Sequence, residues 1–222
     1  NEFLDCLPIR QFIQKDRFAG RAGWHERMVM LDEQDRLSFG VSPEPIAKIL
    51  QDTLPKGQDE ARNDDLIESC PAALQILDLT KARFETHSGR ALFIDYGPET
   101  TEFGDTLQAL KRHEKTGIFS DPGNTDLTAR VDFSALGEIA KTLNLTATQP
   151  VSQREFLSKL GLEMRAVTLS RAKPESKAKI ARQLHRLTDS SEMGELFKAI
   201  CFQSSELAVP IGFRDIAQQD TA

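Results

Sequence analysis

The sequence predicts an α/β fold in which helices and buried strands alternate around a doubly wound sheet. Pro71 stands where a helix begins, because a proline in the first turn costs no hydrogen bond, and Leu74 and Leu77 give this helix an apolar face. The helix is expected to end near residues 88–89 (Ser-Gly). Residues 91–94 (ALFI) follow at once and are typical of a strand buried on both faces.

A β-hairpin is predicted before this helix. Residues 24–31 (WHERMVML) and 36–41 have strand character, and residues 32–35 form the turn. Residues 1–13 are expected to contain the end of a buried strand followed by a loop, and residues 51–65 a solvent-exposed loop. Four further helices are predicted: over 104–113, over 135–143 with Ser134 as its cap, from the capping box at 152–155 to Gly161, and over 175–187. A half-buried extended segment is predicted over 126–133, and a last strand over 196–202.

The composition argues against several classes of function. The chain has 222 residues and a net charge of −6 with scattered Lys and Arg, whereas a nucleic-acid partner requires a basic face. No apolar run approaches the roughly 20 residues that cross a bilayer, so membrane insertion is not expected. The three isolated cysteines indicate a reducing compartment, and with the dispersed histidines they lack metal-ligand spacing. The sequence begins at Asn1 without Met, so it permits no inference about a targeting signal.

Asp95 follows the predicted strand at 91–94, and in an α/β sheet ligands bind beyond the carboxyl ends of the strands. The predicted fold therefore places Asp95, and Tyr96 after it, at the edge of the sheet where a ligand would bind. Both residues have an alternative interpretation, in which they form a strand-end turn and the Tyr96 ring covers the core. The sequence leaves these two interpretations open.

Seven segments, in this order, together resemble the MidA-like family of S-adenosylmethionine-dependent methyltransferases, which includes the mitochondrial NADH:ubiquinone oxidoreductase (complex I) assembly factor. The matching stretches are NEFLDCLPI at 1–9, GWHERMV around Trp24, ALFIDYG at 91–97, GDTLQALKRH at 104–113, DPGNTDLTARVDF at 121–133, SQREFLSKLGL at 152–162 and MGELFKAI at 193–200. Arg130 departs from the family pattern but leaves the motif recognisable.

The resemblance implies a Rossmann-like class I methyltransferase sheet with added helices and a β-hairpin. It makes residues 1–222 the C-terminal portion of one methyltransferase domain, with a substrate-side insertion at about 98–133. The implied reaction is methyl transfer from S-adenosylmethionine to protein arginine, and the implied partner is a subunit of the respiratory NADH dehydrogenase. The family's glycine-rich cofactor loop lies upstream of NEFLD, so we expect this chain alone to be inactive. The expected location is the bacterial cytoplasm, with the mitochondrial matrix as the alternative.

Methylation of a guanidinium requires carboxylates, because the group stays protonated and must be oriented and then deprotonated. The resemblance assigns Glu2 as the guanidinium orienter, Asn1 as a polar contact at the reacting centre, and Asp5 to either role. It also places Asn1 and Phe3 beside the cofactor. The alternative is that these polar side chains only satisfy the backbone of their loop.

The substrate pocket is predicted to include Asp95, Tyr96, His113 and Asp126. His113 with Asp121, Asp126 and Asp132 would form an acidic wall for a cationic peptide, although Asp121 and Asp126 also suit turns and loops.

Two other functions compete with methyl transfer at this level. A non-catalytic assembly protein would grip a partner subunit through residues 98–133. A nicotinamide dehydrogenase would need a GxGxxG loop, which the sequence lacks. The basic residues within 177–186 form either a solvated helix face or a patch for an anionic partner.

Overall fold

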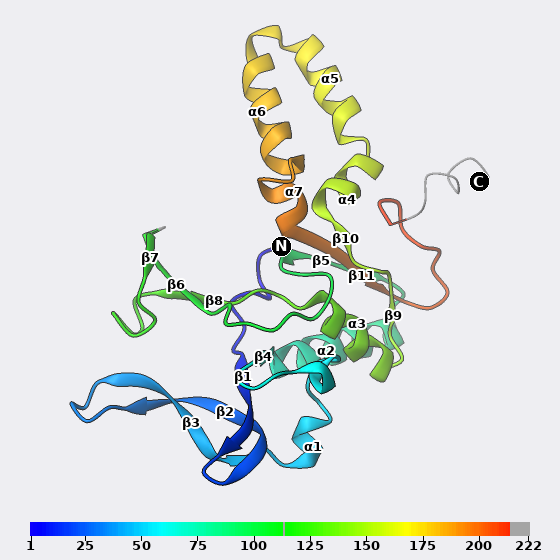
Figure 1. Cartoon of the computed structure of the whole chain (residues 1–222). Coiled ribbons are helices and arrows are strands. Elements are labelled where there is room, and N and C mark those ends of the chain that lie inside the picture. The colour runs from blue at the N-terminus through cyan, green and yellow to red at the C-terminus, as the bar shows by residue number, and fades with distance from the viewer. Residues whose placement is uncertain (113, 214–222) are drawn as a thin grey trace.

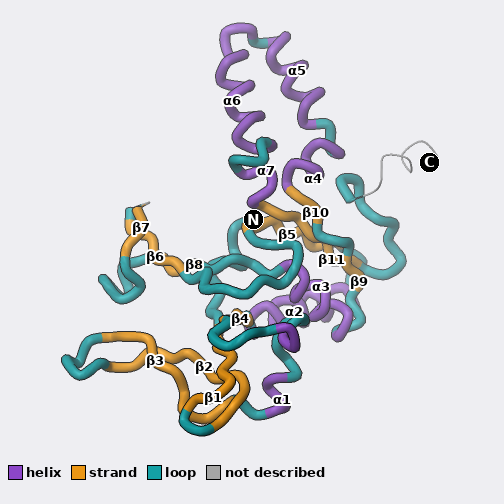
Figure 2. The backbone as a smooth tube through the Cα atoms, viewed as in Figure 1, coloured by secondary structure: helices purple, strands orange, loops and turns teal. Residues whose placement is uncertain are grey.

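The computed structural model describes residues 1–112 and 114–213, in which three sheets and a set of helices form a body from which several segments project (Figures 1 and 2). The central sheet has the strand order β10 (Val151–Ser152), β11 (Phe197–Gln203), β5 (Arg90–Tyr96), and β9 (Thr146–Ala147) also pairs with β11. Helices α2 (Pro71–Thr86) and α3 (Phe133–Thr142) pack together against this sheet, and their core contains Leu77, Phe133, Leu136, Ile200 and Phe202.

The predicted mixture of helices and strands is confirmed, whereas parallel pairing is not found among the described strands. Every pair in the central sheet is antiparallel, because the last strand, β11, returns beside β5 with Phe197 opposite Tyr96 and Gln203 opposite Arg90. All seven residues of β11 are buried. The expectation that residues 91–94 are buried on both faces is wrong, since Leu92 is 46% exposed. β11, and not β5, is the strand enclosed on all sides.

A second sheet with the order β3-β2-β1-β4 contains the predicted hairpin. Strands β2 (Arg21–Leu31) and β3 (Leu37–Pro45) pair around the turn at 32–35, which confirms the hairpin. Strands β1 (Arg10–Phe18) and β4 (Leu66–Ser69) complete the sheet, so residues 1–9 form a loop that precedes a strand, the reverse of the predicted order. The core of this sheet consists of Phe12, Trp24, Leu54 and Ile67, and the loop before β4 includes the short helices α1 (Lys48–Gln51) and η1 (Gln58–Glu60).

The helix predicted over 104–113 is wrong, since β6 (Gln108–Lys111) lies there and pairs with β7 (Glu114–Thr116) and β8 (Asp126–Thr128). Residues distant in sequence hold this segment: Glu68 accepts the backbone N–H of Thr106, and the Thr106 hydroxyl accepts the backbone N–H of Arg130. Helix α3 begins earlier than predicted because its cap is Asp132, which accepts the N–H of Ala135, and not Ser134.

The remaining helices form a projection on the other side of the central sheet (Figure 1). Helix α4 (Gln153–Lys159) is capped by Ser152, as predicted, and Gly161 separates it from α5 (Leu162–Ala172), which the sequence analysis missed. The turn η2 (Pro174–Ser176) leads into α6 (Lys177–Thr188), where the predicted helix and its inward Ile180, Leu184 and Leu187 are confirmed. The short helix α7 (Met193–Leu196) returns the chain to β11.

Asp95, near the end of β5, attaches the N-terminal loop to the central sheet. Its side chain is 1% exposed, and its Oδ2 accepts the backbone N–H groups of Phe3 (2.9 Å), Leu4 (2.8 Å) and Asp5 (3.3 Å). Its Oδ1 accepts the N–H of Tyr96 at 2.9 Å. Hydrogen bonds to a carboxylate are stronger than bonds between neutral groups, so one side chain fixes the course of residues 3–5.

We expect Asp95→Asn to lower the free energy of unfolding by about 2 kcal/mol, because an amide cannot accept hydrogen bonds on both sides and leaves buried N–H groups unpaired. Urea unfolding followed by circular dichroism measures the change. The matched control is Asp126→Asn, which alters an exposed side chain and is expected to change the stability by less than about 0.5 kcal/mol. Equal stability of the two variants would contradict the role of Asp95.

Candidate functional site

The loop that Asp95 holds presents three side chains to solvent. Asn1, Glu2 and Phe3 are exposed, and Asn1 Nδ2 donates a hydrogen bond of 3.3 Å to Glu2 Oε1. Glu2 has a φ of 47°, a left-handed conformation that is uncommon for a residue other than glycine. Its backbone N–H donates to the carbonyl of Ile94 at 2.9 Å, which stabilises this conformation. The Glu2 carboxylate is therefore exposed to a ligand, with a hydrogen bond from Asn1, while its backbone is held by Ile94.

Asp5 and Tyr96 form a half-buried pair behind this loop. Burial raises the pKa of the Asp5 carboxyl, the negative charge of Asp95 raises it further, and hydrogen bonding with Tyr96 opposes both effects. Burial likewise raises the pKa of the Tyr96 hydroxyl. The hydroxyl of Thr128 lies near Tyr96 and lowers that pKa, although Thr128 Oγ1 makes no hydrogen bond of ordinary geometry. The pair can thus exchange a proton with a ligand nearer neutral pH than an ordinary carboxyl can.

Residues 129–133 run beside both parts of the site. Ala129 donates its N–H to the carbonyl of Asp5 at 2.9 Å, and Val131 donates to the carbonyl of Tyr96 at 3.0 Å. A Cβ added to Gly97 would lie 1.9 Å from the carbonyl oxygen of Val131, so only glycine permits this approach. These contacts bring the NEFLD, IDYG and DLTARVDF segments together at one edge of the central sheet.

A cavity of about 610 Å³ adjoins this edge and shares Leu4, Pro98 and Val131 with it. Its walls come from the loop after α1, the first turn of α2, residues 129–132 and helix α3, and they are mainly apolar. Charged side chains such as Arg10, Glu68 and Arg130 also line it. This combination of an apolar wall and a few polar groups is usual for a binding cleft.

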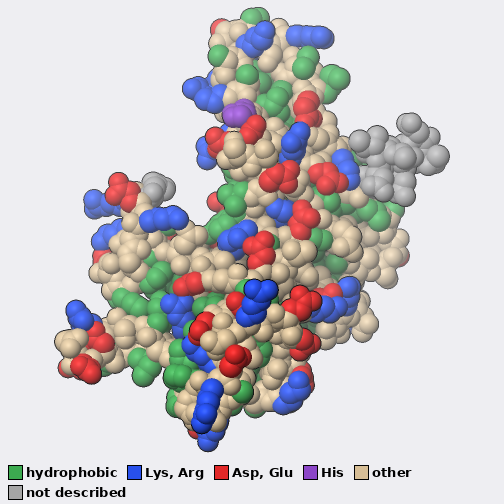
Figure 3. Space-filling model, in the orientation of Figure 1, with side chains coloured by type: hydrophobic (Ala, Val, Ile, Leu, Met, Phe, Trp, Pro, Cys, Tyr) green, Lys and Arg blue, Asp and Glu red, His purple; other side chains and the backbone are tan. Residues whose placement is uncertain are grey.

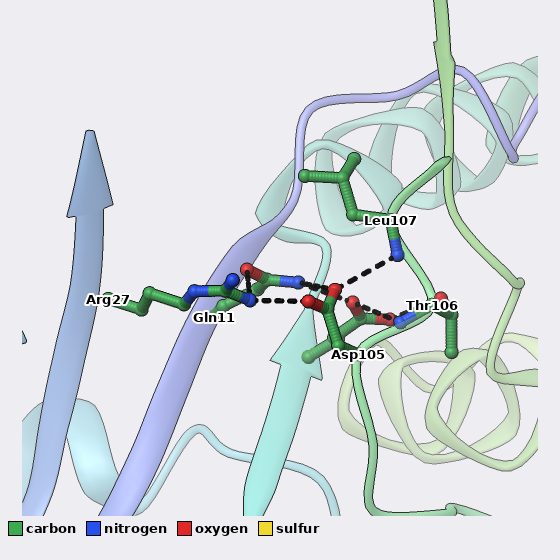
Figure 4. A network of polar contacts seen from close by, with 6 residues as sticks. Gln11, Arg27, Asp105, Thr106 and Leu107 are labelled. Carbon is green, nitrogen blue, oxygen red and sulfur yellow. Dashed lines mark hydrogen bonds and ion pairs between the residues drawn. The ribbon is translucent and has the colours of Figure 1, made fainter. Parts of the chain in front are cut away.

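A polar network joins the hairpin sheet to the segment 105–107 beside this cavity (Figure 4). Gln11 is buried and donates to Glu68 at 2.7 Å and to Asp105 at 2.8 Å, while Arg27 binds Asp105 at 2.6 Å. Burial raises the pKa of Asp105, but the hydrogen bonds from Arg27 and Gln11 outweigh that effect and hold it below its ordinary value. The network fixes Thr106, whose hydroxyl binds both Glu68 (2.5 Å) and the backbone of Arg130 (2.9 Å).

The structure brings together most, but not all, of the residues that the sequence singled out. Asn1, Glu2, Phe3, Asp5, Asp95 and Tyr96 converge on one edge of the sheet. Asp95 is buried, and its two carboxylate oxygens bind backbone N–H groups, so it supports the loop rather than facing a cavity.

The other predicted pocket residues lie elsewhere or have other contacts. Asp126 is exposed on β8, three residues before Ala129. Asp121 pairs with Lys111 and Asn124, and Asp132 caps α3. His113 lies outside the described residues, so the acidic wall that includes it stays a prediction.

Sequence reasoning missed Thr128, Gly97 and the network around Gln11 and Asp105. The IDYG and DLTA motifs contain Gly97 and Thr128, so motif context was the only available signal for these two. Gln11 gave no signal, because the partners of a buried amide are distant in sequence.

Neither a bound metal nor a membrane span is indicated by the described residues. Among them, no group of three or more His, Cys, Asp or Glu side chains is arranged to hold a metal ion. Within the same residues, no helix is both long and apolar enough to cross a bilayer.

Residues 1–151 match the family described as "Putative S-adenosyl-L-methionine-dependent methyltransferase". The mitochondrial protein arginine methyltransferase NDUFAF7 of Danio rerio is 33% identical over 201 residues, which cover 89% of this chain and 45% of that protein. The mouse protein of the same name is 34% identical over 203 residues, which cover 89% of this chain and 43% of that protein.

A solved structure from Burkholderia thailandensis, crystallised with S-adenosyl-homocysteine, superposes with a TM-score of 0.81. It is 29% identical and covers 96% of this chain and 54% of that one. The chain thus spans about half the length of the relatives it matches. On the match over residues 1–151, the chain belongs to this S-adenosyl-L-methionine-dependent methyltransferase family.

Proposed function

We propose that a polypeptide containing this chain transfers a methyl group from S-adenosylmethionine to an arginine side chain of a protein substrate. The observation that carries the proposal is the convergence of an exposed carboxylate, Glu2, and a half-buried proton acceptor, Asp5, on one loop that Asp95 holds rigid. The names of the vertebrate relatives and the S-adenosyl-homocysteine bound to the bacterial relative support the same chemistry.

Glu2 suits the task of orienting a guanidinium. Its side chain is exposed at the edge of the site, and a carboxylate binds a guanidinium through two parallel hydrogen bonds. Such a pair would draw the positive charge towards Glu2 and away from the nitrogen that attacks. The fixed backbone of Glu2 reduces the conformational freedom that must be lost when substrate binds.

Asp5 suits the task of accepting the proton that the attacking nitrogen releases. Its raised pKa makes it a better base than an exposed aspartate, and the Tyr96 hydroxyl is near enough to act on that pKa. Tyr96 in turn packs on Phe197 with ring centroids 5.9 Å apart, so the hydroxyl is held by the sheet. We propose Tyr96 as a positioning residue for Asp5.

The described residues fit one side of the cofactor. When bound, S-adenosylmethionine supplies a methyl group on a sulfonium. Asn1 and Phe3 would hold it from this side, because their side chains are exposed on the loop whose backbone Asp95 fixes. The sequence contains no GxG motif. We therefore propose that the remaining contacts come from polypeptide outside this chain, and we expect the chain alone to be inactive.

The substrate proposal follows from the relatives. Since two of them are named mitochondrial protein arginine methyltransferases, a protein substrate in the mitochondrial matrix is favoured over the bacterial cytoplasm that the sequence analysis expected first. A subunit of the NADH dehydrogenase is the substrate that the family resemblance implies, with a role in complex I assembly. Methylation would leave the guanidinium of such a substrate positively charged.

Glu2→Gln, in a polypeptide that includes the remaining part of the domain, is expected to lower kcat at least about a hundredfold while leaving cofactor affinity nearly unchanged. Methyl transfer to recombinant NADH dehydrogenase subunits, followed by mass spectrometry, gives the rate and identifies the modified residue. Calorimetry gives the cofactor affinity. The control is Glu114→Gln, an exposed glutamate on β7. Wild-type turnover by the Glu2 variant, or methylation of residues other than arginine, would refute the proposal.

Asp5 gives a pH-dependent prediction. Because the pKa of Asp5 is raised in the folded protein, its ionised form opposes folding, and stability falls as pH rises through that pKa. Asp5→Asn is therefore expected to lower activity and yet to raise the stability at pH about 7, with the stability difference vanishing below the unfolded-state pKa of about 3.9. Thermal unfolding across this pH range measures the difference. An Asn variant that is less stable at neutral pH would contradict the assignment.

A further inference from the structure

Helices α5 and α6, residues 162–188, form an antiparallel pair that projects from the body beyond α4 and α7 (Figures 1 and 2). We call this pair the helical arm. Leu162, Ala166 and Ser170 on α5 are partly buried, as are Ile180 and Leu184 on α6. These residues recur every four positions, so they lie on one face of each helix, where the two helices pack together.

The arm is basic in an acidic protein. It contains seven Lys and Arg against two Glu, a net charge of +5, whereas the whole chain carries −6 and the rest therefore −11. Within the described part of the chain, none of the seven cations forms an ion pair. They are Arg165, Arg171, Lys173, Lys177, Lys179, Arg182 and Arg186. Basic side chains gather on this projection in the space-filling view as well (Figure 3).

The outward side of α5 includes exposed apolar side chains. Met164 is 70% exposed and Val167 is 43% exposed. They stand three residues apart, so they are neighbours on the helix surface, and Arg171 continues the same stripe. On α6 the exposed positions include several cations, since Arg182 and Arg186 point away from the packed face and Lys179 flanks it. The arm thus combines an exposed apolar stripe on one helix with unpaired positive charge around it.

We propose that the helical arm is a docking element for an acidic amphipathic segment of a partner protein. Such a segment, in helical form, would place its apolar side on Met164 and Val167 and its carboxylates near Arg165, Arg171 and Lys173. Apolar contacts at helical spacing would set the register of such a segment on the arm. The opposite charge of the partner speeds its approach and suppresses wrong partners.

Charge and shape favour a protein over the other anionic partners. An extended polyanion such as DNA would be repelled by the net charge of −11 on the rest of the chain beside the arm. DNA also offers no apolar surface to the stripe on α5. A bilayer-binding helix requires a wide, continuous apolar face, whereas the exposed apolar side chains of α5, which are Met164, Val167 and Leu169, stand among Arg165 and Arg171. A short acidic helix matches both the length and the charge of the arm.

The test uses a fluorescein-labelled synthetic helical peptide with Glu on its polar face and Leu on its apolar face, and measures its fluorescence anisotropy against the purified chain. We expect binding that weakens with added salt. Arg171→Glu combined with Lys173→Glu is expected to weaken it at least about tenfold. Met164→Asp combined with Val167→Asp is expected to weaken it by a similar factor. The matched control is Arg17→Glu with Lys115→Glu, two exposed cations on β1 and β7, which is expected to retain wild-type affinity.

Several outcomes would overturn the proposal. These are no binding of the peptide by the wild-type chain, an equal loss in the control variant, or retention of binding when the apolar residues of the peptide are scrambled. Tighter binding of phosphatidylserine vesicles or duplex DNA than of the peptide would assign the arm to those ligands instead. Circular dichroism of each variant separates loss of binding from loss of folding. If charge reversal lowers the unfolding temperature but leaves peptide affinity unchanged, the cations serve the fold.

Discussion

The buried carboxylate of Asp95 is the interaction on which the candidate site depends. Its Oδ2 accepts three consecutive backbone N–H groups of a loop that is 90 to 92 residues away in sequence. The loop consequently lies against the end of β5. In this position the Glu2 side chain is exposed and the Asp5 side chain is half-buried, although both belong to one short motif. A neutral side chain at position 95 would leave the same N–H groups without an ionic acceptor. The chemistry proposed for Glu2 and Asp5 therefore requires a carboxylate that is itself buried against the backbone.

Two further constraints keep the surroundings of this loop in place. The absence of a side chain at Gly97 lets residues 129–133 run against Tyr96, which closes the site from one side. The network around Gln11 and Asp105 ties the hairpin sheet to Thr106 and, through its hydroxyl, to Arg130. A displacement of the hairpin would therefore reach the wall of the cavity. This connection gives the added β-hairpin a structural reason for its presence beside the central sheet.

The sequence permitted prediction of elements that local patterns determine. Pro71 starts α2, Ser152 caps α4 and the apolar spacing of α6 identifies its inner face, because these signals lie within the element itself. Residues 104–113 have a helical composition, but Glu68, 38 residues away, binds the backbone of Thr106, and tertiary contact overrides propensity.

The edge where the site forms was predictable, since strand ends and family motifs pointed to Glu2, Asp5 and Tyr96. The inward direction of Asp95 was not predictable, because a residue at a strand end can face either the core or a ligand.

The crystal structure of the longer polypeptide with S-adenosyl-homocysteine and an arginine-containing substrate peptide tests the central claim most directly. The account predicts a guanidinium bound by two hydrogen bonds to the Glu2 carboxylate, with the Asp95 contacts to residues 3–5 unchanged. A guanidinium bound elsewhere, with Glu2 facing bulk solvent, would contradict it.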